Sequence, residues 1–343
     1  MSDTHDPTAL ERRGHLLGLK LRALVRDRLG DDTVGAAEAF APGAALVHAD
    51  AAWVLLDDRP GSRPGSRLGA AITWAVRSGA ATLHVLADTD AGTLARRAAE
   101  FALAISVWRV DGRDLCLAAP QPLPVPGAAP AAHEALRALI VEGGATPVVE
   151  HGVLAGEVRG LEVCRVVDDP FTHAVRLEVG VGAHDREAFQ MLHGDVPAVA
   201  SLARIVREVE RHRGAGARPH PLNRLGAERL LRWRVEQQPE LVGAVALRPV
   251  PPPLPRANLK DPVPCVAAGV DGDGAAVVVV CSSGVDLDLI PFALDARLAA
   301  EAAGPGAERG GRLVAVTPAR DRVPALEGLV ALARRPVELV SID

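Results

Sequence analysis

The stretch of sequence that decides the fold class is residues 82–110, TLHVLADTDAGTLARRAAEFALAISVWRV. Its first five residues form a short apolar run typical of a buried strand, and 105–110 form a second such run. Between them, 91–101 have the apolar spacing of a helix. Parallel sheets are built from such strand–helix–strand units. The stretch therefore predicts an α/β fold with a largely parallel component.

The same alternation extends outward from this stretch in both directions. On the N-terminal side, the spacing of the leucines predicts a helix over 10–29, then a hairpin over 44–57 and a helix over 68–78. On the C-terminal side, apolar runs predict strands at 114–118, 147–150, 157–167, 174–181, 265–270, 275–281, 312–316 and 337–342. Helical spacing predicts helices at 131–142, 227–237, 292–303 and 324–333, and a helical region at 186–213 that is broken near 194–197.

Two proline-rich segments divide the chain. Residues 120–130 contain five prolines, and a second segment, 249–262, opens with five prolines in seven positions. Proline cannot continue a helix or a central strand, so both segments are predicted to be linkers. We expect an N-terminal α/β lobe at 1–119, a middle α/β lobe with arginine-rich helices at 131–248 and a C-terminal α/β lobe at 263–343. The predicted fold class is thus α/β, with two or three lobes of mixed sheet flanked by helices.

These lobes suggest an internal repeat. Residues 174–186 and 276–288 share a pattern of apolar strand, glycine and acidic residues at a spacing of 102 residues, and 44–57 begin in the same order. Chance similarity between valine-rich strands explains the pattern equally well. A repeat requires the second strand of each predicted hairpin to occupy the same position in its sheet.

The composition excludes several classes of protein. The chain has 38 Lys+Arg against 43 Asp+Glu, a net charge of −5, which does not suit a protein that coats nucleic acid or an acidic membrane. A transmembrane helix needs roughly 18 apolar residues, and the densest apolar run, 275–281, is far shorter. The first six residues are polar and unlike a signal peptide. We expect a cytoplasmic protein with no membrane partner.

The scarcity of lysine excludes further chemistry. Lys20 and Lys260 are the only two lysines, so 36 of the 38 basic residues are arginine, and neither lysine stands in a phosphate-binding P-loop. The four cysteines are far apart and form no Cys-x-x-Cys pair, so we expect buried thiols instead of a zinc site. The sequence identifies no cofactor, although a divalent metal remains possible at the acidic positions described below.

Residues 44–115 carry a resemblance to a known superfamily. The hairpin with strand 53–56 is followed by a helix that ends at Ser78-Gly79-Ala80, a strand at 83–87, a helix bearing Thr93, Ala95 and Ala98, and the strand-like run 106–115. This order resembles the core of the restriction-endonuclease-like, or PD-(D/E)XK, superfamily, especially its methylated-DNA-restriction branch. The resemblance implies a nuclease fold in which one acidic residue and a Glu-x-Lys on the next strand bind a divalent metal that activates water.

The catalytic signature of that superfamily is missing here. Leu55-Leu56-Asp57 stands where the resemblance places Glu-x-Lys, and no lysine is near. The fold is therefore expected without the standard activity. In the middle lobe, Glu162 and Glu178 lie on consecutive predicted strands, and with His184 and Asp185 they are the candidate catalytic residues. The alternative is that the two glutamates occupy the solvated sides of strands and that His184-Asp185 begins a helix.

Asp286 and Asp288 form the candidate metal site. They follow the apolar strand 275–281, and the carboxyl ends of strands are where α/β sheets hold ligands. The alternative role for both is to order the loop or cap a helix.

Residues 201–234 hold nine arginines and three acidic residues, a charge of +6 in an otherwise acidic chain. An arginine-rich helix face of this kind can neutralise phosphates. The candidate nucleic-acid-binding residues are Arg204, Arg207, Arg211, Arg213, Arg218 and Arg224. The alternative is an ordinary solvated face, or pairing with acidic residues of the same chain.

The function predicted from these features is that of a degenerate, nuclease-like accessory protein associated with nucleic acid. Two other functions remain open. One is a divergent metal-dependent hydrolase or nuclease that uses the acidic residues at strand ends, and the other is a scaffold that binds another protein.

Overall fold

The structure, a computed structural model, describes residues 7–41, 43–57, 63, 65–170, 172–182, 186, 198–214, 220–255, 263–303 and 311–342. The chain divides into two compact units. The first unit comprises 1–123, 286–295 and 323–337, and the second comprises 124–285, 296–322 and 338–343. The described residues form three sheets flanked by helices, which confirms the predicted α/β class with more than one lobe.

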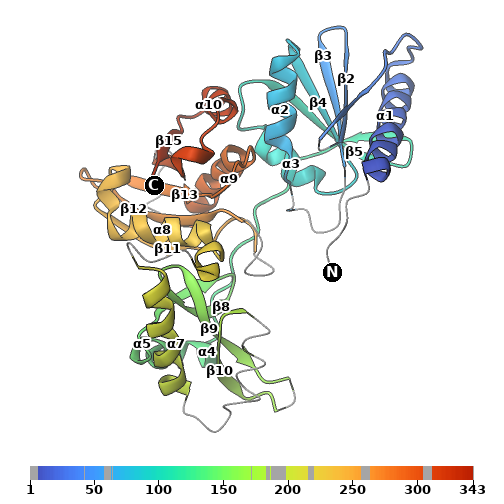
Figure 1. The fold of residues 1–343 in the computed structure, drawn as a ribbon. Helices are drawn as coiled ribbons and strands as arrows, with labels where there is room; N and C mark the ends of the chain where they lie inside the picture. Colours follow the sequence, from blue (N-terminus) through green and yellow to red (C-terminus); the bar gives the residue numbers. More distant parts are fainter. Residues whose placement is uncertain are drawn as a thin grey trace. The chain divides into compact units, whose positions relative to one another are not determined.

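The first sheet has the strand order β1-β2-β3-β4-β5-β6, with β3, β4 and β5 parallel and the other pairings antiparallel. Leu21, Leu24 and Val25 on one face of the first helix pack against Trp53 and other strand residues. In Figure 1, α1 and α2 lie on opposite faces of this sheet. The elements are α1 (Pro7–Leu29), β1 (Glu38–Phe40), β2 (Gly43–His48), β3 (Ala51–Leu56), α2 (Leu68–Arg77), β4 (Thr82–Ala87), α3 (Ala91–Ala98), β5 (Ala104–Asp111) and β6 (Asp114–Leu117).

A buried ion-pair cluster joins α3 to a late segment of the chain within the first unit. The guanidinium of Arg97 donates to the carboxylate of Asp295 at 2.7 Å, and Arg96 donates to the same carboxylate at 2.9 Å. Asp295 and Arg97 are fully buried. Because a buried charge without a partner is very costly, Asp295 is an essential part of the interior of this unit.

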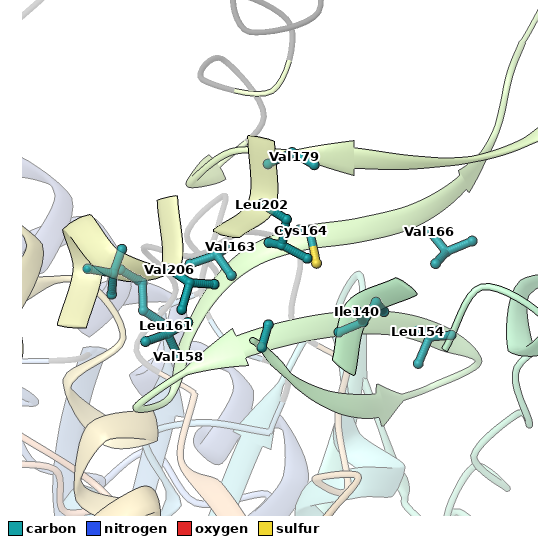
Figure 2. Packing of buried hydrophobic residues seen from close by; sticks show 12 residues of the cluster. Ile140, Leu154, Val158, Leu161, Val163, Cys164, Val166, Val179, Leu202 and Val206 are labelled. Carbon is teal, nitrogen blue, oxygen red and sulfur yellow. The ribbon is translucent and has the colours of Figure 1, made fainter. Parts of the chain in front are cut away.

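The second sheet has the order β10-β9-β8-β7, and all its pairings are antiparallel. Figure 2 shows Leu202 and Val206 of α7 and Ile140 of α5 among the buried residues of β8 and β9, so these helices cover one face. The elements are α4 (Ala131–Glu134), α5 (Arg137–Glu142), β7 (Thr146–Glu150), β8 (Val153–Val158), β9 (Leu161–Asp168), β10 (Val175–Val179), α7 (Ala198–His212) and the 3-10 turn η1 (Pro221–Arg224).

The single strand predicted over 157–167 was wrong, because a tight turn divides it. Arg159 and Gly160 both adopt positive φ angles, 48° and 76°, and connect β8 to β9 as a hairpin. Two consecutive residues with positive φ are typical of the two-residue turns that match the twist of antiparallel strands. The apolar pattern runs through this turn, so periodicity alone did not reveal it.

The third sheet has the order β11-β12-β13-β14-β15, with the first two pairings antiparallel and the last two parallel. The helix predicted at 227–237 is confirmed as α8, whereas β11 was missed because it contains Pro249, which an edge strand tolerates. The elements are α8 (Ala227–Gln237), η2 (Pro239–Val242), β11 (Ala246–Val250), β12 (Cys265–Val270), β13 (Ala276–Cys281), α9 (Leu289–Ala302), β14 (Arg312–Thr317), η3 (Ala319–Asp321), α10 (Pro324–Ala331) and β15 (Glu338–Ser341).

The first and third sheets share one sequence of pairings. From β1 to β5 and from β11 to β15, the order is antiparallel, antiparallel, parallel and parallel. β3 and β13 therefore occupy the same position, with an antiparallel neighbour before and a parallel neighbour after. β10 differs because it is an edge strand with an antiparallel neighbour. The position required by the repeat is thus shared by the first and third lobes and not by the middle one.

Two predictions from the composition concern the burial of the cysteines and the length of the apolar helices. Three of the cysteines are buried as predicted, but Cys116 is exposed, because β6 is the edge strand of its sheet. Within the described residues, no helix is long and apolar enough to cross a bilayer.

Candidate functional site

A network of charged side chains lies between α8 and the face of the second sheet that α5 and α7 leave open. Arg229 and Arg232, one helical turn apart on α8, both reach Glu150 of β7, at 2.8 Å and 3.4 Å. Arg232 also donates to Glu157 of β8 and lies 3.0 Å from Glu236, one turn further along α8. The i, i+3 and i, i+4 spacings on the helix place all three of these α8 side chains on one face.

The strands contribute two glutamates that face each other directly. Glu157 of β8 and Glu162 of β9 are cross-strand partners in the sheet register. Like charges in this arrangement destabilise a sheet unless a cation lies between them. Nη1 of Arg229 supplies that cation, at 3.3 Å from Glu157 Oε1 and 3.6 Å from Glu162 Oε2.

The candidate catalytic glutamates Glu162 and Glu178 lie near each other because both are within ion-pair distance of the same arginine. Arg186 lies 3.2 Å from Glu162 and 3.6 Å from Glu178, and Arg165 adds two further hydrogen bonds to Glu162, at 2.9 Å and 3.0 Å. The interpretation of Glu162 as a solvated strand residue was wrong, because its side chain is only 2% exposed, and that of Glu157 opposite it is 5% exposed. His184 and Asp185 lie outside the described residues.

The network shifts the protonation equilibria of its members. Burial by itself lowers the pKa of Arg229 and Arg232, but Glu157 and the neighbouring acidic groups outweigh this effect and raise both values. For Glu236, burial raises the pKa to about 7, even though Arg232 opposes the shift. The arginines are therefore permanently charged, and Glu236 is the member that titrates near neutral pH.

A pocket of about 190 Å³ opens beside this network. Its apolar wall consists of Val148, Val153, Ala155 and Pro255. Its polar wall consists of Glu150, Glu157, Glu162, Arg165, Arg229 and His151. In the described part of the chain, no group of three or more His, Cys, Asp or Glu side chains is arranged to hold a metal ion. Since each glutamate of the polar wall lies within ion-pair distance of an arginine, the pocket is suited to hydrogen bonding more than to metal binding.

The candidate nucleic-acid-binding arginines divide into two groups. Arg204, Arg207 and Arg211 lie exposed on α7, and Arg211 pairs with Glu208 at 2.8 Å. Arg204 and Arg207 have no ion-pair partner among the residues that the structure describes. Arg218 and the side chain of Arg224 lie outside the described residues. Only the first three can therefore be assigned to a surface.

Arg213 has a different environment from the exposed arginines of α7. It is buried, and its guanidinium donates to the carbonyl oxygens of Arg159, Leu222, Leu225 and Gly226. Burial lowers the pKa of Arg213 to about 10, and the positive charges of Arg234 and Arg159 add to the shift. Arg213 therefore holds residues 222–226, which lead into α8, against the end of α7.

The contacts of Arg159 were not predicted from the sequence. Arg159 lies 5.6 Å above the ring of Trp233, and it also donates to the carbonyl oxygen of Glu210 at the end of α7. Gly160 brings the turn close to α8, since a Cβ there would lie 2.2 Å from the carbonyl oxygen of Arg229. Arg159 thus lies between Trp233 of α8 and the end of α7. The sequence signal that could have revealed this turn was the Arg-Gly pair between two apolar runs.

The candidate metal ligands Asp286 and Asp288 lie in the first unit and have structural partners. Asp288 accepts hydrogen bonds from the backbone N–H groups of Arg67, at 2.5 Å, and Gly69, at 3.0 Å, and so caps the start of α2. Burial raises the pKa of Asp288, and repulsion from Asp286 adds to the shift. Asp286 is paired with Arg63 at 3.1 Å. Both observations correspond to the alternative role, in which the pair orders a loop and caps a helix.

Asp57 stands where the resemblance places the catalytic Glu-x-Lys. It is buried at the end of β3, and its carboxylate accepts several hydrogen bonds from the guanidinium of Arg13. A pocket of about 30 Å³ lies next to it at the carboxyl ends of β3 and β4, which is the usual ligand position in an α/β sheet. This volume has room for about two water molecules.

The chain was compared with known proteins. It matches no protein-family model, no curated protein and no solved structure.

Proposed function

We propose that this chain is a non-catalytic, nucleic-acid-associated accessory protein of the cytoplasm, and that its binding surface is formed by α7, the β8–β9 turn and α8. The observation that carries this proposal is the contact between Arg159 and Trp233, with the guanidinium 5.6 Å from the centre of the ring. Arg159 also donates to the carbonyl oxygen of Glu210 at the end of α7. Arg204 and Arg207 are exposed on the same helix.

The chemistry of this surface suits a single strand better than a duplex. Arginine contacts to phosphate supply affinity that is independent of sequence, and aromatic rings stack on bases. Stacking on one aromatic side chain contributes about 1–3 kcal/mol per base. A single tryptophan beside Arg159 is therefore sufficient for a modest site with little sequence preference.

The non-catalytic part of the proposal is supported by the arginine partners of the acidic residues. Asp57, Glu157, Glu162 and Asp286 each lie within ion-pair distance of arginine, a cation that competes with a metal ion for the same oxygens. The nuclease-like part of the proposal is supported by the element order of the first sheet. There, an antiparallel hairpin leads through α2 and α3 to two parallel strands.

The proposal also includes a common origin for the first and third lobes. It is supported by their shared sequence of strand pairings and by the equivalent contacts of α1 and α8 with the first strands of their sheets. Under this proposal, the middle antiparallel lobe is an insertion between two copies of one α/β unit.

Binding as a function of salt tests the proposed function. Fluorescence anisotropy with a labelled single-stranded oligonucleotide is expected to show an affinity that falls steeply as salt rises. If Arg204 and Arg207 each contact one phosphate, the Arg204→Glu/Arg207→Glu variant should reduce the logarithmic salt slope by about 1.4, since each single-strand contact contributes about 0.7. Arg234→Glu should weaken binding as well.

Arg248→Glu is the matched control, because Arg248 is an exposed arginine of β11 in the same unit. It is expected to bind like the wild type. An affinity that is independent of salt, or equal losses for Arg248→Glu and the α7 variant, would contradict the proposal. Cleavage of the oligonucleotide in the presence of Mg²⁺ would contradict its non-catalytic part.

A further inference from the structure

Two of the buried cysteines lie directly opposite each other in the third sheet. Cys265 of β12 and Cys281 of β13 are partners in the antiparallel register, and both residues are fully buried. Directly opposite residues of an antiparallel pair project from the same face of the sheet, with their Cβ atoms about 4.5–5.5 Å apart. The Cβ atoms of a disulfide are about 3.5–4.5 Å apart. A small approach of the two side chains therefore suffices to join them, without a change of register.

The pair occupies the open end of the β12–β13 hairpin. Cys265 is the first residue of β12 and Cys281 is the last residue of β13, so both lie at the opposite end from the turn at 271–275. Strand ends open locally at a lower cost in free energy than strand centres. Such an opening would admit a small oxidant to thiols that the closed structure shields.

The two thiols have different electrostatic surroundings. Burial raises the pKa of Cys281 well above its ordinary value, and a negative charge on Cys265 adds to this shift. Burial lowers the pKa of Arg229 and Arg232 of α8, and the charge of Cys265 is among the effects that raise both. By reciprocity, the two guanidinium groups favour the thiolate of Cys265. Cys265 is therefore suited to attack an oxidant, and Cys281 is suited to resolve the product.

We propose that Cys265 and Cys281 form a reversible disulfide when the protein meets a hydroperoxide. The thiolate of Cys265 attacks a peroxide oxygen, the O–O bond breaks, and Cys265 becomes a sulfenic acid. The departing hydroxide or alkoxide takes up the proton that Cys265 had lost. The sulfur of Cys281 then attacks the sulfur of Cys265, and the hydroxyl group leaves as water with the thiol proton of Cys281. Two thiols are oxidised to one disulfide, and the peroxide is reduced.

This inference goes beyond the proposed function, because it concerns the interior of the third sheet and not the α7 surface. Cys281 packs with Leu231 and Val235 of α8. The disulfide would therefore tie the open end of the β12–β13 hairpin beneath that helix. A dithiol reductant would release it again.

The other two cysteines provide internal controls. Cys116 is exposed on the edge strand β6. Cys164 is buried in the second sheet, where its register partners are Gly156 and Val179, and burial raises its pKa to about 12. Neither has a cysteine opposite it, so one reports on an accessible single thiol and the other on a buried single thiol.

Timed exposure of the full chain to hydrogen peroxide, followed by alkylation in denaturant and peptide mass spectrometry, provides the test. In the wild type, Cys265 and Cys281 should be lost together as one crosslinked peptide pair. Their loss should be at least about tenfold faster than that of Cys164, because a neighbouring thiol makes the second step intramolecular. Dithiothreitol should restore both thiols.

Cys281→Ser should abolish the crosslink. Cys164→Ser is the matched control, because it removes a buried thiol from the second sheet, and it should leave the crosslink unchanged. If Cys281→Ser fails to fold, the wild type alone still decides the question, since a crosslinked peptide with Cys164 reduced identifies the disulfide in the folded protein. Oxidation of Cys265 without a bond to Cys281, a bond from either cysteine to Cys116, or survival of both thiols while Cys116 is oxidised would overturn the proposal.

Discussion

The indole N–H of Trp108 donates a hydrogen bond to Nδ1 of His84 at 3.1 Å, across the neighbouring parallel strands β5 and β4. This bond requires a lone pair on Nδ1, so the proton of the neutral imidazole is on Nε2. The ring of Trp53 stacks on the other side, with ring centroids 4.0 Å apart. His84 is therefore held in its neutral form inside the first unit.

This arrangement predicts a pH dependence of stability. Burial lowers the pKa of His84, and the positive charge of Arg28 adds to the shift, so protons bind more readily to the unfolded chain. The contribution of His84 to stability should be complete above pH 6.5 and should decline as pH falls below that value toward its lower folded-state pKa. Urea unfolding at pH 7.5 and 5.5 should show a larger loss for the wild type than for His84→Phe. Identical losses would contradict this assignment.

Removal of Arg232 should be severe. Arg232→Ala leaves Glu150 and Glu157 buried with only part of their countercharge, and breaking a buried pair in this way costs about 3–5 kcal/mol. Arg211→Ala is the matched control, because its pair with Glu208 is exposed and such pairs contribute about 0–1 kcal/mol. The free energy of unfolding of both variants, measured with urea at pH 7.5, checks the difference.

Glu236 should be destabilising at high pH. Burial raises its pKa to about 7, so the folded protein disfavours the charged form of Glu236. The contribution of Glu236 to the free energy of unfolding is therefore lost as pH rises through that value. Glu236→Gln, which is neutral at every pH, should therefore melt at a higher temperature than the wild type at pH 8 and at nearly the same temperature at pH 5. If Glu236→Gln melts at a lower temperature than the wild type at pH 8, the ion pair between Glu236 and Arg232 outweighs the cost of burying the charge.

Asp288 should act as a helix cap. Asp288→Ala leaves the N–H groups of Arg67 and Gly69 without their acceptor, and loss of such a cap costs about 0.5–2 kcal/mol. Asp288→Asn retains a side-chain oxygen and should cost less. Thermal melts with and without Mg²⁺ check both points, and a rise in melting temperature caused by Mg²⁺ in the wild type alone would favour a metal site instead.

The sequence was most informative where structure depends on near neighbours. Helix α8 was predicted at its observed bounds, because helical spacing begins after Gly226, whose φ of 56° few other residues adopt. The parallel strands β4 and β5 followed from one strand–helix–strand unit. The hairpin at Arg159 was missed because a two-residue turn does not interrupt the apolar pattern of its strands.

The candidate site was harder to predict, because burial is decided by distant segments. Glu157 is covered by α8, about 70 residues later in the chain, and no local pattern reports this contact. Arginine composition likewise did not distinguish Arg213, which holds a loop, from Arg207, which faces solvent. The acidic strand residues and the arginine-rich segment were each noticed in the sequence, and their pairing was one of the alternatives, but the sequence did not identify which residues pair.

The cluster of Arg96, Arg97 and Asp295 determines when the first unit can finish folding during synthesis. The ribosome adds Asp295 about 200 residues after the two arginines, so the emerging N-terminal region must wait, without its countercharge, for most of the polypeptide to be translated. A protein fragment that ends at the first proline-rich segment would lack Asp295, so its two arginines would never gain this countercharge.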